Sequence, residues 1–454
     1  MEKPTLPKGT RDFGPAMMAK RQFIIGVIKK VFERYGFQQL ETPAMENLST
    51  LTGKYGEEGD QLLFKVLNSG DFLKDVKADT LNTASSKNLI PFITEKGLKY
   101  DLTVPFARYV VMNRHEVNTP FKRFQIQPVW RADRPQKGRY REFYQCDADV
   151  IGTDSLLCEA EIILMIREVM DQLGFKDYTI KVNHRGILSA LAELAGAKGN
   201  ESALFVAIDK LDKIGEAKVK EELGNKGFDP TSIDRIFKIL NFKGSNLEKI
   251  DFISSQIGSS TKGKKGIKDM SDILSLLSRF DLAADAFELD IPLARGLSYY
   301  TGTIFEVKIN NVAIGSVSGG GRYDDLTGVF GDKEKLSGVG ISFGLDRLYD
   351  ALEELNLFPS GTEVSSRVMV AHFDETSMLY GIKVLKALRD EGIASELYPD
   401  ITKIKKQLDY ANRKKIPYVI VIGEEEMKSG QLTFKDMQKG EQQKLPLNEI
   451  LISF

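Results

Sequence analysis

The sequence predicts an α+β protein: an antiparallel sheet, then a helical insertion, then a separate α/β domain toward the C-terminus. Two runs within residues 121–152 alternate apolar and polar residues, which is the pattern of half-buried strands. Residues 186–280 are rich in Lys, Glu, Leu and Ile, and their apolar residues recur at helical spacing. From residue 367 onward, strand-like runs alternate with helical runs, which is typical of a parallel or mixed α/β domain.

The composition is that of an ordinary globular protein of two or three domains. The 454 residues are 42% hydrophobic and 28% charged, a balance that argues against wholesale disorder. The formal net charge is −1, so any nucleic-acid site must be a local basic region. The two cysteines, Cys146 and Cys158, exclude a disulfide framework and a four-cysteine zinc site, and they fit a reducing cytosol.

No membrane segment and no metal site are predicted. No apolar run approaches the length of a transmembrane helix, and the first residues lack the apolar region of a signal peptide. His115, His184 and His372 lie too far apart in the sequence to form a local metal motif. A cytoplasmic protein is therefore expected.

Apolar spacing and the positions of proline and glycine predict the order of the elements. Helices are expected to begin near Pro15 and Pro105, because proline favours the first helical position, and Thr103 is expected to cap the second. The other elements expected before residue 351 are a mobile tail over 1–14, strands over 37–43, 62–67, 178–182 and 289–309, a surface excursion over 68–97, a helix over 156–173, and a strand running into a helix over 338–348. Beyond a linker over 351–366, strands are expected over 367–373, 393–398, 418–422, 432–436 and 444–447, and helices over 377–391 and 402–414.

Two glycine-rich stretches interrupt this pattern. Residues 258–266 are expected to form a loop within the helical insertion. Residues 315–325, GSVSGGGRYDD, hold three consecutive glycines beside Arg322 and Tyr323. Glycine runs usually form turns, but glycine also lets the backbone approach a ligand closely, so both interpretations stay open for the second stretch.

The predicted hairpin within residues 121–152 has an unusual polar face. Arg123, Gln125, Gln127 and Arg131 share one parity of the first strand, and the matching positions of the second strand are Arg141, Phe143, Gln145, Asp147 and Asp149. A solvated sheet face is the alternative, but such faces are commonly filled with Lys, Glu and Thr. Guanidinium groups suit phosphate, carboxylates and amides suit an ammonium group, and a lone aromatic ring suits a flat base.

The loop between these strands resembles motif 2 of the class II aminoacyl-tRNA synthetases, and in detail that of the histidyl-tRNA synthetase family. It reads RADRPQKGRYREF over residues 131–143. The helix, strand and proline over 15–43 resemble motif 1, and GVGISFGLDRL over 338–348 resembles motif 3. ARGLSYYTG over 294–302 resembles the family's histidine signature. Asp101, Leu102 and Thr103 resemble its amino-acid-binding segment, in the eukaryotic and archaeal form.

The resemblance implies a class II synthetase fold and the ligation of L-histidine to histidine tRNA through a histidyl-adenylate. The substrates would be L-histidine, ATP with Mg²⁺, and tRNA, with no tightly bound prosthetic group, and motif 1 would form a homodimer. The implied domains are a catalytic core over 1–185 and 281–358, a helical insertion over 186–280, and an anticodon-binding domain over 367–454.

The resemblance also implies a role for each site residue. Arg131 and Arg295 would be catalytic and would grip the α-phosphate and the histidine carboxylate. The residues implied to bind histidine are Asp101, Leu102, Thr103, Arg131, Gln145, Asp149, Arg295, Tyr299 and Tyr300. Those implied to bind ATP are Arg131, Arg139, Phe143 and Arg347, with Phe143 on adenine and Arg347 on the terminal phosphate. Those implied to bind tRNA are Arg134, Gln136, Lys137, Arg139, Lys403 and Lys406.

The chain departs from the family pattern at two positions. Asp133 replaces the usual glutamate of motif 2, and Ser298 stands where the histidine signature has aspartate. Two other functions are weighed. A catalytically silent, histidine-sensing regulatory subunit typically lacks the C-terminal domain and the arginine set, and this chain has both. A related synthetase for another amino acid is the second alternative.

Overall fold

The computed structural model describes residues 3–74, 76–77, 81, 85–197, 199–257, 259–294, 299–331 and 335–454. The chain divides into two compact units, which are described separately. The larger unit comprises Met1–Asp12 and Ile24–Leu357, and the smaller comprises Phe13–Phe23 and Phe358–Phe454.

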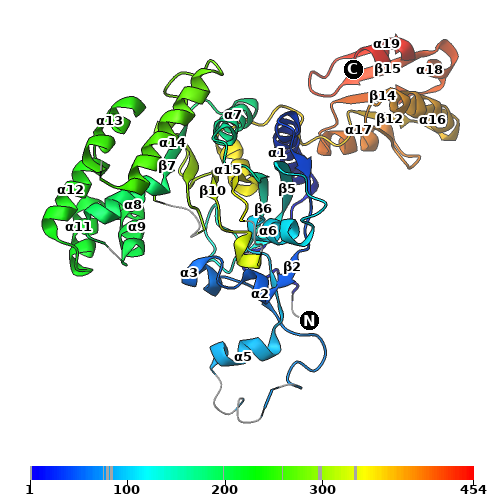
Figure 1. Ribbon diagram of the computed structural model, residues 1–454. Helices are drawn as coiled ribbons and strands as arrows, with labels where there is room; N and C mark the ends of the chain where they lie inside the picture. The colour runs from blue at the N-terminus through cyan, green and yellow to red at the C-terminus, as the bar shows by residue number, and fades with distance from the viewer. Residues whose placement is uncertain are drawn as a thin grey trace. The chain divides into compact units, whose positions relative to one another are not determined.

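The larger unit is built on one broad, mainly antiparallel sheet (Figure 1), which is called the large sheet below. Among the described residues it has eight strands in the order β1-β5-β6-β11-β10-β9-β7-β8. Their bounds are β1 Gln38–Gln39, β5 Phe121–Trp130, β6 Glu142–Ile151, β11 Gly338–Gly344, β10 Ser318–Tyr323, β9 Thr303–Ile309, β7 Tyr178–His184 and β8 Glu288–Leu289. The strands from β5 to β7 pair antiparallel, whereas β1 and β8 pair in parallel at the two edges. The predicted antiparallel sheet and the β5–β6 hairpin within it are confirmed.

Helices cover the two faces of the large sheet differently. The apolar parity of the hairpin packs against helix α1 (Pro15–Arg34): the ring of Phe32 lies 5.8 Å from that of Phe124 and 6.1 Å from that of Phe343. The polar parity faces helix α6 (Thr103–Met112), where the guanidinium carbon of Arg123 lies 4.3 Å from the ring centre of Phe106. Helices α7 (Leu157–Gln172) and α15 (Leu345–Glu354) complete the core beside β11 and β6. The polar face is therefore buried around Arg123 and Asp149, whereas Arg131 and Phe143 at its other end are only partly buried.

Several predicted bounds were wrong. Within the strand expected over 37–43, only Gln38–Gln39 pairs, with β5. The strand expected over 289–309 is divided into β8 and β9. The excursion over 68–97 contains helix α5 (Ser86–Ile93) and strand β4 (Lys96–Leu98), and it projects away from the large sheet (Figure 1). Strand β4 pairs with β2 (Met45–Asn47) and β3 (Lys65–Val66) in a small sheet. Helices α2 (Leu48–Leu51) and α3 (Gly56–Gln61) lie between β2 and β3 in the sequence.

The insertion between β7 and β8 is helical, as predicted. Its described helices are α8 Arg185–Leu194, α9 Glu201–Asp209, α10 Leu211–Ile214, α11 Glu216–Asn225, α12 Pro230–Leu240, α13 Asn246–Ile257 and α14 Thr261–Ser278. The loop expected over 258–266 was wrong, because α14 begins at Thr261. A Cβ on Gly263 would lie 2.8 Å from that of Ala190, and one on Gly266 would lie 2.8 Å from Nδ1 of His184. These glycines allow α14 to pack closely on α8 and β7. Residue 258 lies outside the described residues.

The smaller unit confirms the alternation predicted beyond residue 367. Its sheet runs β13-β12-β14-β15-β16, parallel among the first three strands and antiparallel thereafter. The strands are β12 Val368–His372, β13 Ser395–Leu397, β14 Tyr418–Ile422, β15 Gln431–Asp436 and β16 Gln442–Pro446, and the helices are α16 Glu375–Asp390, α17 Ile404–Arg413, α18 Glu424–Ser429 and α19 Leu447–Ile452. The two short helices, α18 and α19, were not predicted. Within the expected linker over 351–366, helix α15 continues to Glu354.

A buried ion pair ties the glycine-rich strand β10 to α7, and its loss should destabilise the larger unit. Arg322 binds Glu159 with two bonds of 2.5 and 2.6 Å, and it also donates to the Ser337 hydroxyl at 2.7 Å. Arg322→Ala leaves the Glu159 carboxylate buried and unpaired, so we expect a loss of about 3–5 kcal/mol in unfolding free energy. Thermal unfolding measures this loss of stability. Lys335→Ala is the control, because Lys335 pairs with Asp325 at the surface, and its loss should cost at most about 1 kcal/mol. Equal midpoints for the two variants would contradict this assignment.

Candidate active site

The polar residues of the hairpin meet in register on one face of the large sheet. Arg123 lies opposite Asp149, Gln125 opposite Asp147, and Gln127 opposite Gln145. The predicted parity is therefore confirmed. The expected alternative, a solvated face, is wrong, because Asp147 is only 2% exposed and Asp149 only 3%. Burying a charge costs free energy unless the charge is paired, so a sheet face that buries two carboxylates is unusual.

Asp149 is held by two residues that the sequence analysis did not select. Its Oδ2 lies 2.8 Å from Nη2 of Arg123, and its Oδ1 accepts a 2.8 Å hydrogen bond from the Tyr323 hydroxyl. Burial raises the pKa of Asp149, and Arg123 and the Tyr323 hydrogen bond oppose that rise. On the neighbouring strand, a Cβ at Gly340 would lie 2.1 Å from Oδ1 of Asp149, so a side chain there would displace the carboxylate. Pairing Arg123 with Asp149 across the predicted hairpin could have revealed the first partner.

Asp101 occupies a second buried polar position, at the start of α6. Its Oδ1 accepts hydrogen bonds from the Tyr55 hydroxyl at 3.0 Å and from the N–H of Val104 at 3.1 Å. Its Oδ2 accepts from the Tyr299 hydroxyl at 3.1 Å. Burial raises the pKa of Asp101 despite these bonds. The expected capping of this helix by Thr103 is therefore wrong: the helix begins at Thr103, and Asp101 satisfies the first turn.

The neighbouring residues of the same segment also face the site. The carbonyl of Leu102 accepts a 3.2 Å hydrogen bond from Nη2 of Arg123, which joins α6 to the hairpin. The buried Thr103 side chain is hydrogen-bonded to Tyr299. Nε2 of Gln145 donates to the Ser342 hydroxyl at 2.7 Å. Among the described residues, Asp101, Leu102, Thr103, Gln145, Asp149 and Tyr299 of the predicted histidine-binding set thus converge from β6, the start of α6 and the segment before β9.

The tyrosine pair lies against the glycines of β10. The rings of Tyr299 and Tyr300 are 5.0 Å apart, edge to face. A Cβ at Gly321 would lie 2.9 Å from a ring carbon of Tyr300, and one at Gly320 would lie 2.1 Å from the carbonyl oxygen of Gly340. Burial and the charges of Asp149, Asp101 and Asp147 raise the pKa of Tyr300. The glycine run is therefore a strand and not a turn, and its glycines make room for Tyr300 and for the adjacent strand.

Arg131 lies at the end of β5, between two aromatic rings. Its guanidinium carbon is 4.2 Å from the ring centre of Tyr100 and 5.2 Å from that of Phe143. Its Nε donates to the Tyr100 carbonyl at 3.0 Å. These contacts hold the planar group beside the half-buried Phe143 ring. An arginine and a flat ring thus lie together where a nucleotide could contact both.

The motif 2-like loop, residues 134–141, is a tight turn whose charges are partly paired. The backbones of Gln136 and Arg139 exchange hydrogen bonds of 3.1 and 2.9 Å around Gly138. Lys137 pairs with Glu354 at 2.8 Å, and Arg139 lies 3.5 Å from Asp133, whereas Arg134 and Gln136 are exposed. Arg347 holds the turn from α15, donating to the Gly138 carbonyl at 2.9 Å and to the Ser316 carbonyl at 2.5 Å.

The N-terminal segment docks on this loop, so the expected mobile tail is wrong. The guanidinium carbon of Arg11 lies 3.3 Å from the ring centre of Tyr140, and Arg11 also forms an ion pair with Asp346. The carbonyl of Gly9 accepts a 2.9 Å hydrogen bond from the N–H of Arg141.

The basic residues of the smaller unit are only partly available. Lys403 and Lys406 are exposed at the start of α17. Lys414 pairs with Glu396 at 2.7 Å, and Lys415 pairs with Glu363 at 2.9 Å.

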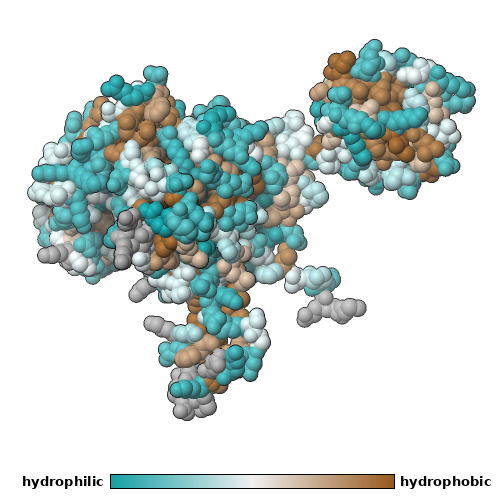
Figure 2. Space-filling view, turned by 45° about the vertical axis from the view of Figure 1, so that its right-hand side comes forward, coloured by the Kyte–Doolittle hydropathy of each residue, from teal (hydrophilic) through white to brown (hydrophobic). Residues whose placement is uncertain are grey.

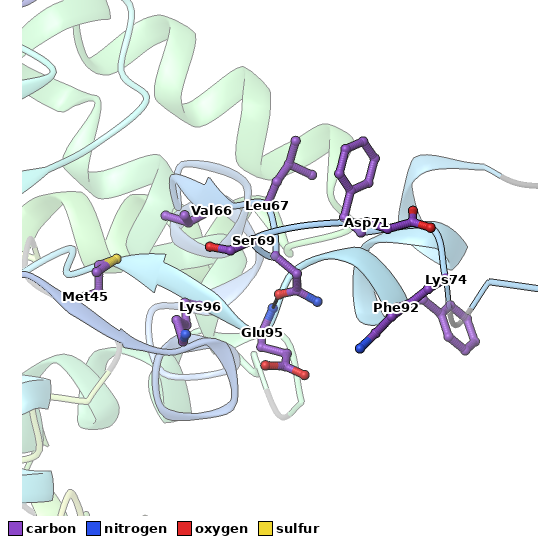
Figure 3. A pocket seen from close by; sticks show the side chains of 11 residues that line it. Met45, Val66, Leu67, Ser69, Asp71, Lys74, Phe92, Glu95 and Lys96 are labelled. Carbon is purple, nitrogen blue, oxygen red and sulfur yellow. Dashed lines mark hydrogen bonds between the residues drawn. The ribbon is translucent and has the colours of Figure 1, made fainter.

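Arg295 and Ser298 lie outside the described residues. A cavity of about 360 Å³ opens on the small sheet and not on the polar face (Figure 3). It is lined by Met45, Val66, Leu67, Asn68, Ser69, Asp71, Phe72, Lys74, Phe92, Glu95 and Lys96. In the part of the chain that the structure describes, no three His, Cys, Asp or Glu side chains gather as a metal site would need, and no helix could cross a membrane.

Comparison with known proteins finds relatives that cover nearly the whole chain. A family model described as "Histidyl-tRNA synthetase" matches residues 94–348, and one described as "Anticodon binding domain" matches residues 367–452. The histidine–tRNA ligase of Cytophaga hutchinsonii is 56% identical over 99% of both chains, and that of Porphyromonas gingivalis is 53% identical over 100% of this chain and 99% of its own. The crystal structure of histidyl-tRNA synthetase from Nostoc sp. PCC 7120 superposes over the full length of both chains with a TM-score of 0.85 at 28% identity.

Proposed function

Because this chain belongs to the histidyl-tRNA synthetase family, we propose that its buried polar face activates L-histidine with ATP for transfer to histidine tRNA. Family membership gives the reaction, which is that of a histidine–tRNA ligase, a class II aminoacyl-tRNA synthetase. The observation that supports the location is the meeting of Arg123, Gln145 and Asp149 with Asp101 and Tyr299 in one enclosed polar region.

The first step joins histidine to AMP. The histidine carboxylate attacks the α-phosphorus of ATP, an acyl-phosphate bond forms, and pyrophosphate leaves. This chemistry needs positioning and neutralisation of negative charge more than a protein nucleophile. Arg131, with Arg295, would supply the positive charge at the α-phosphate and the histidine carboxylate. The two aromatic contacts of Arg131 support this role, because they limit the positions that its guanidinium can adopt.

The nucleotide would bind beside Arg131. Phe143 would stack on adenine, Arg139 would contact the phosphates, and Arg347 would reach the terminal phosphate. Arg347 now donates to two carbonyls, so ATP would share or replace these bonds. Mg²⁺ would enter on the phosphates, since it keeps most of its ligands from phosphate and water, and the described carboxylates form no three-residue cage for it.

Histidine would lie between the two buried carboxylates. Asp101, Thr103 and Gln145 would hold the α-ammonium group, Asp149 and Tyr300 would address the imidazole, and Leu102 and Tyr299 would line the site. The hydrogen bonds that already orient Asp101 and Asp149 support these roles, because a pre-positioned carboxylate loses little freedom when the ligand binds. In the second step, a ribose hydroxyl of the terminal tRNA adenosine attacks the histidyl carbonyl, and AMP leaves.

Aminoacylation of total tRNA with each amino acid tests this function. We expect charging with histidine alone. Charging with a different amino acid would indicate a related synthetase, and histidine binding without any charging would indicate the regulatory alternative.

We propose that the enzyme is a homodimer with catalytic domains over 1–185 and 281–358, an insertion over 186–280 and an anticodon-binding domain over 367–454. The resemblance implies dimerisation through motif 1, but Ile24, Ile28 and Phe32 of this segment are buried within the chain. The support comes instead from the excursion, whose exposed hydrophobic side chains include Phe72 and Phe92. Figure 2 shows hydrophobic surface on this projecting part of the larger unit. Light scattering at micromolar concentration should give about twice the 50.8 kDa chain mass, and a single-chain mass would contradict the proposal.

The motif 2-like loop and α17 would contact tRNA through Arg134, Gln136, Lys137, Arg139, Lys403 and Lys406. Gln136→Ala should reduce aminoacylation at least about tenfold while changing pyrophosphate exchange less than about twofold, because the exposed side chain would touch only tRNA. The two assays on one enzyme preparation provide the comparison. Equal losses in both would place Gln136 in the adenylate site. The cytoplasm is the proposed location, since the free thiols of Cys146 and Cys158 suit a reducing compartment.

A further inference from the structure

The polar face contains buried polar atoms that lack hydrogen-bond partners. Among the described residues these are two donors, Nε and Nη1 of Arg123, and three acceptors, Oε1 of Gln125, Oε1 of Gln145 and Oδ1 of Asp147. Gln125 lies directly opposite Asp147, and Gln145 is two residues from Asp147 on the same face of β6. A buried acceptor without a donor typically costs about 1–3 kcal/mol. The three acceptors therefore suit a ligand group that carries several N–H donors on one atom.

Of the three carboxylates in the site, Asp147 has the most capacity for such a group. Asp101 already accepts from Tyr55, Val104 and Tyr299, and both oxygens of Asp149 are engaged by Arg123 and Tyr323. Asp147 is hydrogen-bonded to Ser342, and its Oδ1 remains unsatisfied.

The charges around Asp147 do not neutralise it fully in the empty site. Arg123 on β5 favours its ionised form, but Arg123 is paired with Asp149. Asp147 also interacts electrostatically with Lys99. Nζ of Lys99, however, donates hydrogen bonds to the Thr42 carbonyl and to Gln127. Among the described residues, Asp101, Asp149 and Tyr300 also interact with Asp147. Burial, together with Asp149 and Asp101, raises the pKa of Asp147 to about 7, so this carboxyl group takes up a proton in the empty site far more readily than an exposed aspartate does.

We propose that Asp147 is a second counter-ion, beside Asp101, for the α-ammonium group of bound histidine and that it releases a proton to solvent when histidine binds. The O–H bond of the carboxylic acid breaks, the proton passes to buffer, and the carboxylate accepts an N–H from the ammonium group. Ionised Asp147, with the amide oxygens of Gln125 and Gln145, then meets the donors of one ammonium group. This assignment rests on the proposed function, and it adds a specificity residue to the histidine site.

Calorimetric titration of histidine into the full-length enzyme, in buffers of different ionisation enthalpy at pH 7, measures the proton release. The wild type should release more protons per histidine bound than Asp147→Asn, since titration of the ligand's own imidazole is common to both. Asp154→Asn, an exposed carboxylate just beyond the same strand, should match the wild type. Below pH 7 the proton competes with histidine, so the wild-type affinity should rise between pH 6 and 8 more steeply than that of Asp147→Asn.

The outcomes separate this inference from the proposed function. Equal proton release by the wild type and Asp147→Asn, with histidine bound by both, would overturn the role of Asp147 alone. Failure of the wild type to bind histidine would instead overturn the proposed function and the inference with it. Difference infrared spectroscopy of the wild type needs no variant: histidine should remove the C=O stretch of a protonated carboxyl group, and an unchanged stretch would also overturn the inference.

Discussion

Arg131→Ala is expected to abolish histidine-dependent adenylate formation while the protein stays folded. The guanidinium group lies between the rings of Tyr100 and Phe143, and it is only partly buried at the end of β5. Removing the guanidinium group should therefore leave the negative charge that develops at phosphorus without this positive partner. Little core packing should be lost. Loss of one such electrostatic contact typically costs about a hundredfold or more in rate. ATP–pyrophosphate exchange measures this step without tRNA.

Arg134→Ala is the matched control for Arg131→Ala. Arg134 lies three residues further along the chain, it is exposed, and its proposed partner is tRNA. Exchange by Arg134→Ala should stay within about twofold of the wild type, because tRNA takes no part in that assay. Near-normal exchange by Arg131→Ala would reject the role given to Arg131. Arg295→Ala is expected to match Arg131→Ala in this assay.

Asp149→Asn is expected to raise the histidine KM and lower turnover while leaving the ATP KM nearly unchanged. A charge-assisted bond to the imidazole becomes a neutral bond of roughly half the strength. An increase of about tenfold in KM corresponds to ~1.4 kcal/mol. The substitution also removes the charge that faces Arg123 at 2.8 Å, so the thermal midpoint should fall. Titration of both substrates in the exchange assay separates the effect on histidine from any effect on ATP.

Tyr323→Phe provides a graded comparison for Asp149→Asn. It removes the 2.8 Å hydrogen bond to Oδ1 of Asp149 but keeps the carboxylate and its partner Arg123. The histidine KM should therefore rise less than in Asp149→Asn, again with the ATP KM nearly unchanged. An unchanged histidine KM and turnover in Asp149→Asn, or a loss confined to ATP, would remove Asp149 from the histidine site.

The pattern along the chain was sufficient to predict the hairpin and its polar face, because strand alternation determines which side chains share a face. It did not reveal that Tyr323 holds Asp149, since that contact comes from a strand far away in the sequence. The pattern also did not predict that α6 covers this face. A solvated face therefore stayed open as an alternative. The hairpin's polar residues were predictable, and their burial was not.

Glycine and the chain termini account for most of the other differences. Gly263 and Gly320 looked like loop or turn residues, but each lies where a neighbouring atom leaves no room for a Cβ. A local pattern cannot distinguish the two uses of glycine, because the close neighbour comes from another part of the chain. The segment around Arg11 likewise looked mobile, since its partners Tyr140 and Asp346 are distant in the sequence.

The measurement that most directly tests the account is ATP–pyrophosphate exchange by the wild-type protein, run with each of the twenty amino acids in turn. The enclosed set of Asp101, Gln145 and Asp149 predicts exchange that depends on histidine and that Arg131→Ala eliminates. Exchange supported by another amino acid, or histidine-dependent exchange that survives Arg131→Ala, would contradict the assignment of this polar face as the site of histidine activation.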